Sequence, residues 1–255
     1  MATRTERDSM GELEVPFDAL YGAQTQRAIN NFPVSHTPMP TAFIHAVTRI
    51  KLAAARANQT LGGLDSARGE AIQKAARDVL TGKHDQHFPI DVFQTGSGTS
   101  TNMNVNEVLA TLASREGVEV TPNDHVNMGQ SSNDVIPTAI HLSAAIAVHE
   151  SLRPALVHLR DTIDQRASEL SHVVKTGRTH LMDAMPLRMD QELGAWSSQI
   201  NQAIERFDSA MKRLCRLAQG GTAVGTGVNA PAGFAEQVAQ ELSEQTGLMF
   251  TPNDS

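Results

Sequence analysis

The chain has 255 residues, of which 40% are hydrophobic and only 4% aromatic, so aliphatic side chains and methionine must fill its interior. Its formal net charge is −7 and its basic residues are scattered, which argues against a nucleic-acid-binding surface. A single cysteine, Cys215, excludes an internal disulfide and a cysteine-based metal cluster. The polar N-terminus and the lack of a run of roughly 18 apolar residues argue against a leader and a membrane span, so we expect a cytoplasmic protein.

The first half of the chain is predicted to contain several short helices. Residues 1–40 are expected to be irregular, because turn-forming residues and prolines interrupt any periodicity. Beyond them, apolar residues recur every three or four positions, and Asp65 is placed to cap a helix. We expect helices over residues 41–61, 65–80 and 102–114, separated by a loop over 83–101 and followed by a connection over 117–124.

The second half is predicted to contain two long helices, over residues 137–172 and 189–217, with a break over 175–186 between them. Pro154 is expected to kink the first of these helices. A glycine-rich irregular stretch over 220–233 and a short helical pattern at 234–242 follow. Alternating strand patterns are few, so the sequence predicts an all-α, mainly helical fold.

The domain organisation is predicted from the lengths of these helices. We expect a small N-terminal helical domain over residues 1–130 and the first part of a long central helical bundle over residues 131–255. Long helices pack best against other long helices. Two long helices and a fragment leave broad apolar stripes uncovered, which predicts either more chain or a partner.

Three polar clusters interrupt the helical patterns. The first includes Ser97, Gly98, Thr99 and Asn102 at a predicted helix start. Glycine allows close approach of the backbone, and a helix N-terminus attracts anions. This pattern is equally typical of a flexible loop with a helix cap.

The second cluster contains Ser131, Ser132, Asn133 and Asp134, directly before an apolar helical pattern. One of them suffices to cap the helix. The surplus hydroxyl and amide donors predict an uncharged cradle for an anion, and the alternative is a solvated turn.

The third cluster places Thr179 and His180 in the break between the long helices. Histidine can move a proton near neutral pH, although a single histidine is more often structural. Asp183 follows three residues later without a second histidine at zinc-ligand spacing, which argues against a metal site. The glycines of residues 220–231 indicate either close backbone approach or a flexible connection. No strand precedes them, so a dinucleotide fingerprint is not supported.

Five segments resemble the class II fumarase and aspartase family, in the family's order and over nearly the whole chain. They are MGELEVPFDALYGAQTQRAINNF, GSGTSTNMNVNEVLA, HVNMGQSSNDVIPTAIH, TGRTHLMDAMPL and GGTAVGTGVNAP. The resemblance implies three helical domains with a long central bundle, and a homotetramer that associates through the bundles. Active sites would combine segments of three subunits, bind a small dicarboxylate and require no metal or other cofactor.

The resemblance also implies roles for individual residues. His180 would belong to the acid–base apparatus, and Thr179 would contact the substrate beside it. The remaining substrate-binding residues would be Ser97, Gly98, Thr99, Asn102, Ser131, Ser132 and Asn133. Because fumarases have histidine after this threonine and aspartases have glutamine, His180 favours reversible hydration of fumarate to L-malate. Aspartate ammonia-lyase and a non-catalytic, helix-pairing protein remain alternatives. Argininosuccinate and adenylosuccinate lyases share the histidine but not YGAQTQRA.

Two departures from the family pattern stand out. The flexible GSSxMPxKxN loop, which would supply the serine base, is not among these residues, and neither is a carboxylate partner for the histidine. The resemblance therefore predicts an incomplete copy of a longer enzyme that is inactive alone. A secondary carboxylate site would include Asn123 and Asp124. It is weakened because Val118 and Thr121 stand where fumarases often have Arg and His.

Overall fold

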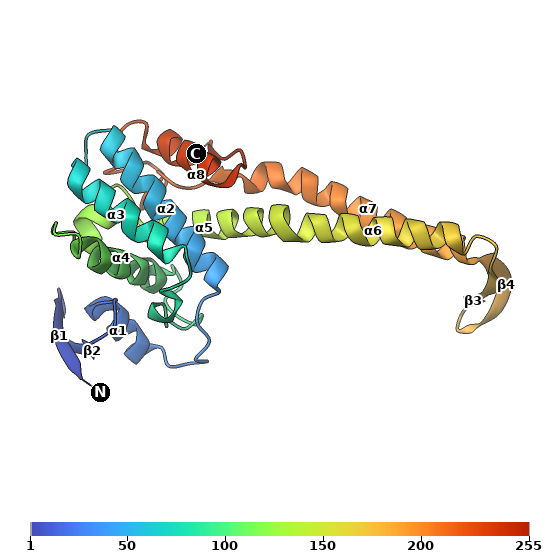
Figure 1. Ribbon diagram of the computed structural model, residues 1–255, viewed down its shortest axis with the longest axis horizontal. Helices are drawn as coiled ribbons and strands as arrows, with labels where there is room; N and C mark the ends of the chain where they lie inside the picture. Colours follow the sequence, from blue (N-terminus) through green and yellow to red (C-terminus); the bar gives the residue numbers. More distant parts are fainter. Residues whose placement is uncertain (1, 255) are drawn as a thin grey trace. The chain divides into compact units, whose positions relative to one another are not determined.

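The computed structural model describes residues 2–254 and divides into two compact units. The larger unit comprises Met1–Ser143 and Cys215–Ser255, and the hairpin unit comprises Ala144–Leu214. Figure 1 labels their α-helices and the strands β1 to β4. The predominantly helical fold expected from the sequence is confirmed. The expected domain boundary near residue 130 remains a prediction, because it concerns the domains of the longer protein that the resemblance implies and not the compact units of this chain.

The larger unit contains most of the elements. In chain order these are β1 (Thr3–Asp8), β2 (Gly11–Pro16), α1 (Ala23–Asn31), α2 (Thr41–Thr60), α3 (Ser66–Val79), the 3₁₀ turn η1 (Asp85–His87), α4 (Thr99–Ser114), the π turn η2 (Pro122–Val126), α5 (Ser132–Ala147), β5 (Arg216–Leu217), α8 (Phe234–Thr246) and β6 (Thr251–Pro252). The division between the units falls within α5.

The core of the larger unit forms around α2, which packs against α3, α4 and α8. Val47, Ile50 and Ala54 of α2 are completely buried, as their helical spacing predicts. Asp65 caps α3 by accepting a hydrogen bond from the backbone N–H of Arg68 at 3.1 Å, as expected. Helix α4 is buried on nearly all sides from residue 101 to residue 110, although half of these residues are polar or charged. Such a helix needs internal partners for its side chains.

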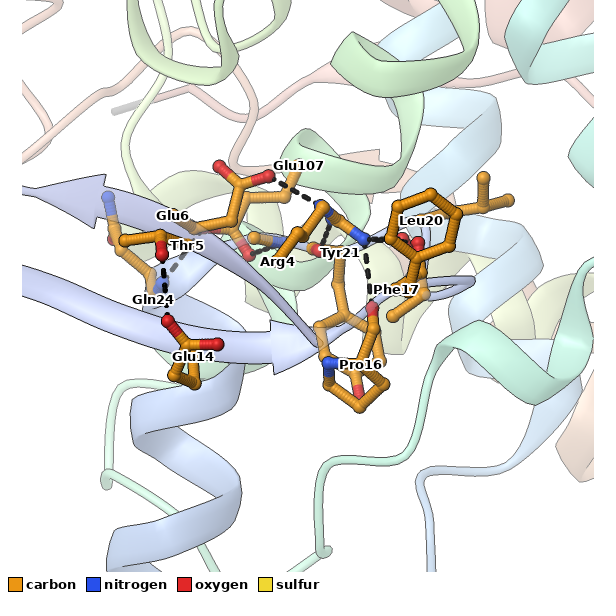
Figure 2. Close-up of polar contacts among 12 residues, drawn as sticks. Arg4, Thr5, Glu6, Glu14, Pro16, Phe17, Leu20, Tyr21, Gln24 and Glu107 are labelled. Atoms are coloured by element: carbon orange, nitrogen blue, oxygen red, sulfur yellow. Dashed lines mark hydrogen bonds and ion pairs between the residues drawn. The ribbon is translucent and has the colours of Figure 1, made fainter. Parts of the chain in front are cut away.

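The expectation that residues 1–40 are irregular is wrong. Strands β1 and β2 form an antiparallel hairpin with Thr3 opposite Pro16, and α1 follows. Because β1 reads TRTERD, it shows no apolar alternation from which a strand could be predicted. Figure 2 shows Arg4 of β1 reaching the turn after β2. Its guanidinium donates hydrogen bonds to the carbonyl oxygens of Pro16, Ala19 and Tyr21 at 2.7–2.9 Å.

The hairpin unit consists of paired helices and a β-hairpin. Its elements are the end of α5, the π turn η3 (Val148–Leu152), α6 (Arg153–Glu169), β3 (Val174–Thr179), β4 (Met182–Arg188) and α7 (Met189–Leu214). Figure 1 shows α6 and α7 side by side, and they are packed together. The break expected over 175–186 is instead the antiparallel β3–β4 hairpin. Val174 and two threonines on the first strand favour this structure, and the two residues at its tip are not typical turn formers.

The first long helix differs from its predicted form. Helical structure begins at Ser132, before Pro137, and ends at Glu169. The expected effect of Pro154 appears as the wider π turn η3 directly before it. Proline lacks the N–H that would donate to the carbonyl of Glu150, so regular α-helical bonding cannot continue there.

One helical span of the described residues, Ser132–Glu169, is long and apolar enough to cross a membrane, with a mean hydropathy of 1.3 over its best 18 residues. The span includes polar residues such as His141 and Ser143, so the expectation that no unbroken run of roughly 18 apolar residues occurs still holds. Core helices pass the same test of length and composition, so this span is weak support for a membrane protein.

Candidate functional site

The first two polar clusters lie together in the larger unit. The side-chain amide of Asn102 in α4 donates a hydrogen bond to the hydroxyl oxygen of Ser132 in α5, at 3.1 Å. Gly98 adopts a left-handed conformation, with φ 67°, and a Cβ there would lie 3.0 Å from the side chain of Ile136. Glycine therefore allows the loop before α4 to approach α5 closely. The fold thus joins two segments that are about 30 residues apart in the chain.

The hydroxyl groups of this cluster remain accessible. The side-chain oxygens of Ser97 and Thr99 are 2.8 Å apart, and both residues are exposed. Ser131 and Ser132 are half-buried at the start of α5. The Ser131 hydroxyl oxygen accepts a hydrogen bond from the backbone N–H of Asn133 at 3.3 Å. The arrangement presents neutral donors at a helix N-terminus, which suits a carboxylate.

Asp134 anchors the glycine-rich segment to the start of α5. One carboxylate oxygen accepts hydrogen bonds from the backbone N–H groups of Gly220 at 3.0 Å and Thr222 at 2.9 Å, and the other accepts from Ser131. Burial raises the pKa of Asp134, and these backbone donors together with the charge of Lys51 oppose the rise. The carboxylate is therefore committed to the protein and is not free for a ligand.

The glycine-rich segment approaches the rest of the larger unit closely, as one of the two sequence-based readings predicted. Gly220 has φ 96°, and a Cβ there would lie 2.6 Å from the Cβ of Ala235. The side-chain amide of Asn133 donates to the carbonyl oxygen of Ala223 at 2.8 Å. Residues 131–134 are therefore held from two sides, by α4 and by this segment.

A buried lysine that the sequence analysis did not single out lies beneath these segments. Lys51 of α2 is completely buried, and its ammonium group donates to the side-chain oxygens of Asn127 at 2.9 Å and Gln130 at 3.0 Å. Burial lowers the pKa of Lys51 to about 7, and the charge of Asp134 opposes this change. The burial of Lys51 could have been predicted from the sequence, because residue 51 lies on the apolar face of α2, between Val47 and Ala54.

Two asparagines near this lysine have unused hydrogen-bonding capacity. The side-chain oxygens of Asn102 and Asn106 are buried and accept no hydrogen bond from the described residues. Their amide nitrogens both donate to the side-chain oxygen of Asn127 at 3.2 Å. Buried polar groups in folded proteins nearly always have a partner, so this interior suits water or a polar ligand.

The third cluster belongs to the hairpin unit. His180 and Leu181 form the two-residue loop between β3 and β4, with φ values of 52° and 62°. Both conformations are left-handed, as a type I′ turn requires, and such a conformation is uncommon for leucine. Thr179 and His180 are exposed. The other predicted site residues belong to the larger unit.

The secondary carboxylate site has little electrostatic support. Asn123 lies in η2 and lines a pocket of about 500 Å³, while Asp124 is exposed. Three acidic residues, Glu6, Asp8 and Glu107, and one basic residue, Arg7, line that pocket. An acidic lining opposes a second dicarboxylate, so this site stays a weak prediction.

Comparison with known proteins assigns the chain to a family. A sequence profile described as a lyase matches residues 11–255, which is nearly the whole chain. The chain belongs to this lyase family. Among the described residues, no group of three or more His, Cys, Asp or Glu side chains is placed to hold a metal ion.

The relatives of this chain include class II fumarate hydratases, which confirms the resemblance seen in its segments. A fumarate hydratase class II from Pseudomonas aeruginosa is 61% identical over 253 residues, covering 99% of this chain and 55% of the relative. A fumarate hydratase class II from Xylella fastidiosa is 58% identical, covering 97% of this chain and 52% of the relative. The chain therefore spans about half the length of the curated relatives it matches.

Solved structures support the same fold for this chain. The class II fumarase from Schistosoma mansoni matches with a TM-score of 0.96 at 41% identity, covering 100% of this chain and 58% of that chain. A fumarate lyase:delta crystallin from Brucella melitensis, in its native form, matches with a TM-score of 0.89 at 35% identity. It covers 100% of this chain and 59% of that chain.

Proposed function

We propose that the chain contributes the carboxylate-binding segments of a class II fumarase, which hydrates fumarate reversibly to L-malate. The observation that carries this proposal is the hydrogen bond from Asn102 to Ser132, because it joins two donor-rich segments into one polar surface. The names of the two fumarate hydratase relatives support the choice of substrate. Ser97, Gly98 and Thr99 would line one side of the bound dicarboxylate, and residues 131–133 would line the other.

The chemistry of Ser132 suits this role. Its hydroxyl oxygen already accepts the N–H of Asn102, so its own O–H is available to donate to a ligand. In the pair formed by Ser97 and Thr99, one hydroxyl donates to the other, and one O–H remains available. Neutral donors at a helix start hold a carboxylate without a fixed cation at the surface.

His180 would act in proton transfer in the same reaction, with Thr179 contacting the substrate beside it. Its imidazole is exposed at the tip of the β3–β4 hairpin, where the protein holds an uncommon left-handed turn. Strained backbone is often found at functional positions. A histidine, unlike a glutamine, can accept or donate a proton near neutral pH. This difference favours malate over aspartate as the substrate of the reverse reaction.

Binding is tested with the 255-residue chain and fumarate as the probe. A ligand that binds only the folded protein raises its melting temperature. We expect fumarate to protect the chain against heat, and Ser132→Ala to weaken binding about tenfold, which corresponds to roughly 1.4 kcal/mol. Ser143→Ala, in the same helix, is the matched control and should bind as the wild type does. Full protection of Ser132→Ala would exclude the proposed site.

Turnover is tested by the ultraviolet absorbance of fumarate formed from malate or from aspartate. The assay uses this chain and a version extended through the segment that the longer relatives have beyond it. We expect the extended protein to act on malate, and His180→Gln to lower kcat by about 100-fold or more, as expected for a lost proton-transfer group. The unextended chain is expected to be inactive. Turnover of aspartate but not malate would support the ammonia-lyase alternative, and turnover of neither would favour a helix-pairing protein.

Self-association and location complete the proposal. We place the protein in the cytoplasm as a homotetramer, as the family resemblance implies. Within residues 144–214, only Ala145, Ser197 and Ile204 are buried. Helices with so little interior are stabilised by packing against further helices, which supports association through this unit.

A further inference from the structure

Lys51 is the most deeply buried charged group that the proposed chemistry does not use. It lies on the core face of α2 and is 0% exposed. Transfer of an ammonium group from water to a protein interior is costly unless the group is paired and hydrogen-bonded. A methionine would fill a similar volume without that cost. The presence of a lysine here therefore calls for a role that its polar contacts explain.

These contacts connect Lys51 to the proposed carboxylate-binding surface. Its ammonium group holds Asn127 and Gln130, which lie in the turn directly before Ser131. The side-chain oxygen of Asn127 also accepts from Asn102. The Asn102 amide donates in turn to Ser132. A continuous chain of hydrogen bonds therefore runs from α2 through the turn and α4 to the start of α5.

The charge on Lys51 strengthens this chain. Hydrogen bonds from an ionised donor are shorter and about twice as strong as neutral ones. The contact to Asn127, at 2.9 Å, is shorter than the two neutral contacts to the same oxygen, at 3.2 Å. A buried positive charge below a surface of hydroxyl donors also favours an anion at that surface, because the interior screens charge less than water does.

We propose that Lys51 is a positioning residue for the dicarboxylate site, fixing Asn127 and Gln130 so that Asn102 and Ser132 present their polar groups to the ligand. The inference rests on the proposed function, which it deepens by naming a residue that does not touch the substrate. It also assigns a role to the buried charge, which favours the dianion from beneath the site.

The inference implies a dependence of fumarate binding on pH. Burial lowers the pKa of Lys51 to about 7, so the ammonium loses its charge as the pH rises through that value. Asp134 is the carboxylate whose charge acts on Lys51. On the elements that pack against α2, Glu107 of α4 is bonded to the backbone of α1, and Glu241 of α8 is paired with Arg56. His125 of η2 accepts from the backbone N–H of Thr121 and is the histidine for which the experiment needs a control.

The experiment measures protection of the 255-residue chain against heat by fumarate, over a range from about pH 6 to about pH 8, where fumarate stays a dianion. We expect the apparent Kd of the wild type to rise about tenfold across this range. Lys51→Met should bind weakly at both ends, with no change between them. Lys74→Met, the same substitution at an exposed lysine, and His125→Asn, which keeps an acceptor for Thr121, should both retain the wild-type profile.

A mutant cycle separates positioning from general loss of structure. If Lys51 acts through Asn127, the double variant with Asn127→Ala should bind no more weakly than the weaker single variant. If the losses of binding free energy in the two single variants add up in the double variant, Lys51 does not act through Asn127. If Lys51→Met does not fold, the pH dependence of fumarate binding to the wild type tests the inference instead. A rise in the apparent Kd that persists in His125→Asn supports it. An apparent Kd that does not change with pH, or a rise that is lost in His125→Asn, overturns it.

The outcomes for the inference and for the proposed function are distinct. If fumarate protects the wild type at no pH, the proposed function fails. If fumarate protects both the wild type and Lys51→Met with the same pH profile, the dicarboxylate site stands and the role of Lys51 is excluded.

Discussion

Single buried carboxylates hold the loops of the larger unit in place. Asp91 accepts hydrogen bonds from the backbone N–H groups of Ser35, His36 and Phe93 at 2.6–2.8 Å. His36 is thereby held in a left-handed conformation, with φ 56°. Asp134 performs the same task for the glycine-rich segment. In both cases one carboxylate supplies several acceptors that a loop cannot provide for itself.

Replacing Asp91 by asparagine should destabilise the protein in a pH-dependent manner. Burial alone would raise the pKa of Asp91, but the bonds from Phe93, Ser35 and His36 outweigh it and lower the pKa from 3.8 to about 2. The stabilisation is therefore complete above about pH 4 and is lost as the pH falls through about 2. Urea unfolding of the wild type and Asp91→Asn at several pH values measures the difference.

The control for this prediction is Asp124→Asn, at an exposed position with one long contact of 3.5 Å to the Thr121 hydroxyl. Its unfolding free energy should follow that of the wild type at each pH. A constant difference between the wild type and Asp91→Asn down to about pH 2 would contradict the assignment.

Helix α1 depends on a residue from another element for its cap. Gly22 at its N-cap has no side chain to offer, and Glu107 of α4 accepts from the backbone N–H groups of Gly22, Gln24 and Thr25 at 2.9–3.1 Å. The Thr25 hydroxyl donates to the same carboxylate at 2.6 Å. Figure 2 shows Glu107 approaching this turn. A carboxylate at a helix N-terminus also interacts favourably with the helix dipole.

Glu107→Gln should therefore lower the unfolding free energy by about 1–3 kcal/mol, because the amide group replaces one acceptor oxygen with a donor. Equilibrium denaturation measures this loss. The matched control is Glu116→Gln, which removes an exposed contact to Lys74 and should cost less than about 1 kcal/mol. Equal losses in the two variants would show that the cap does not stabilise α1.

At the scale of the whole molecule, the hairpin unit has too little interior to account for its own stability. The sequence predicts apolar stripes that the chain leaves uncovered, and of the apolar residues along α7 only Ile204 is buried, while Trp196 is 51% exposed. On the partner helix α6, Leu159 is 45% exposed. Large apolar surfaces of this kind mark sites of association.

Trp196→Glu is expected to weaken self-association by about tenfold or more, because aromatic side chains dominate the binding energy of interfaces. Sedimentation over a range of concentrations measures the change. Val34→Glu, at a 62% exposed position of the larger unit, is the control and should leave the assembly unchanged. An unchanged sedimentation profile for Trp196→Glu would place the interface elsewhere.

The sequence by itself determined the features that depend on near neighbours. The helices around Val47 and Phe207 follow from apolar spacings of three and four. Asp65 is recognisable as the N-cap of α3, where it accepts a hydrogen bond from the backbone N–H three residues later. The donor-rich character of the cluster at Ser132 is also local. These properties depend on residues that are close in the sequence, so the amino-acid sequence alone suffices to predict them.

Only the tertiary structure decided which distant groups meet. Glu107 caps a helix that begins more than 80 residues earlier, and Lys51 binds Asn127 across 76 positions. The β1–β2 hairpin is stabilised by Arg4 rather than by any apolar alternation of its own. The physical reason is the same in each case. A buried polar group is satisfied by whichever donor or acceptor the packing brings to it, and packing depends on the whole chain.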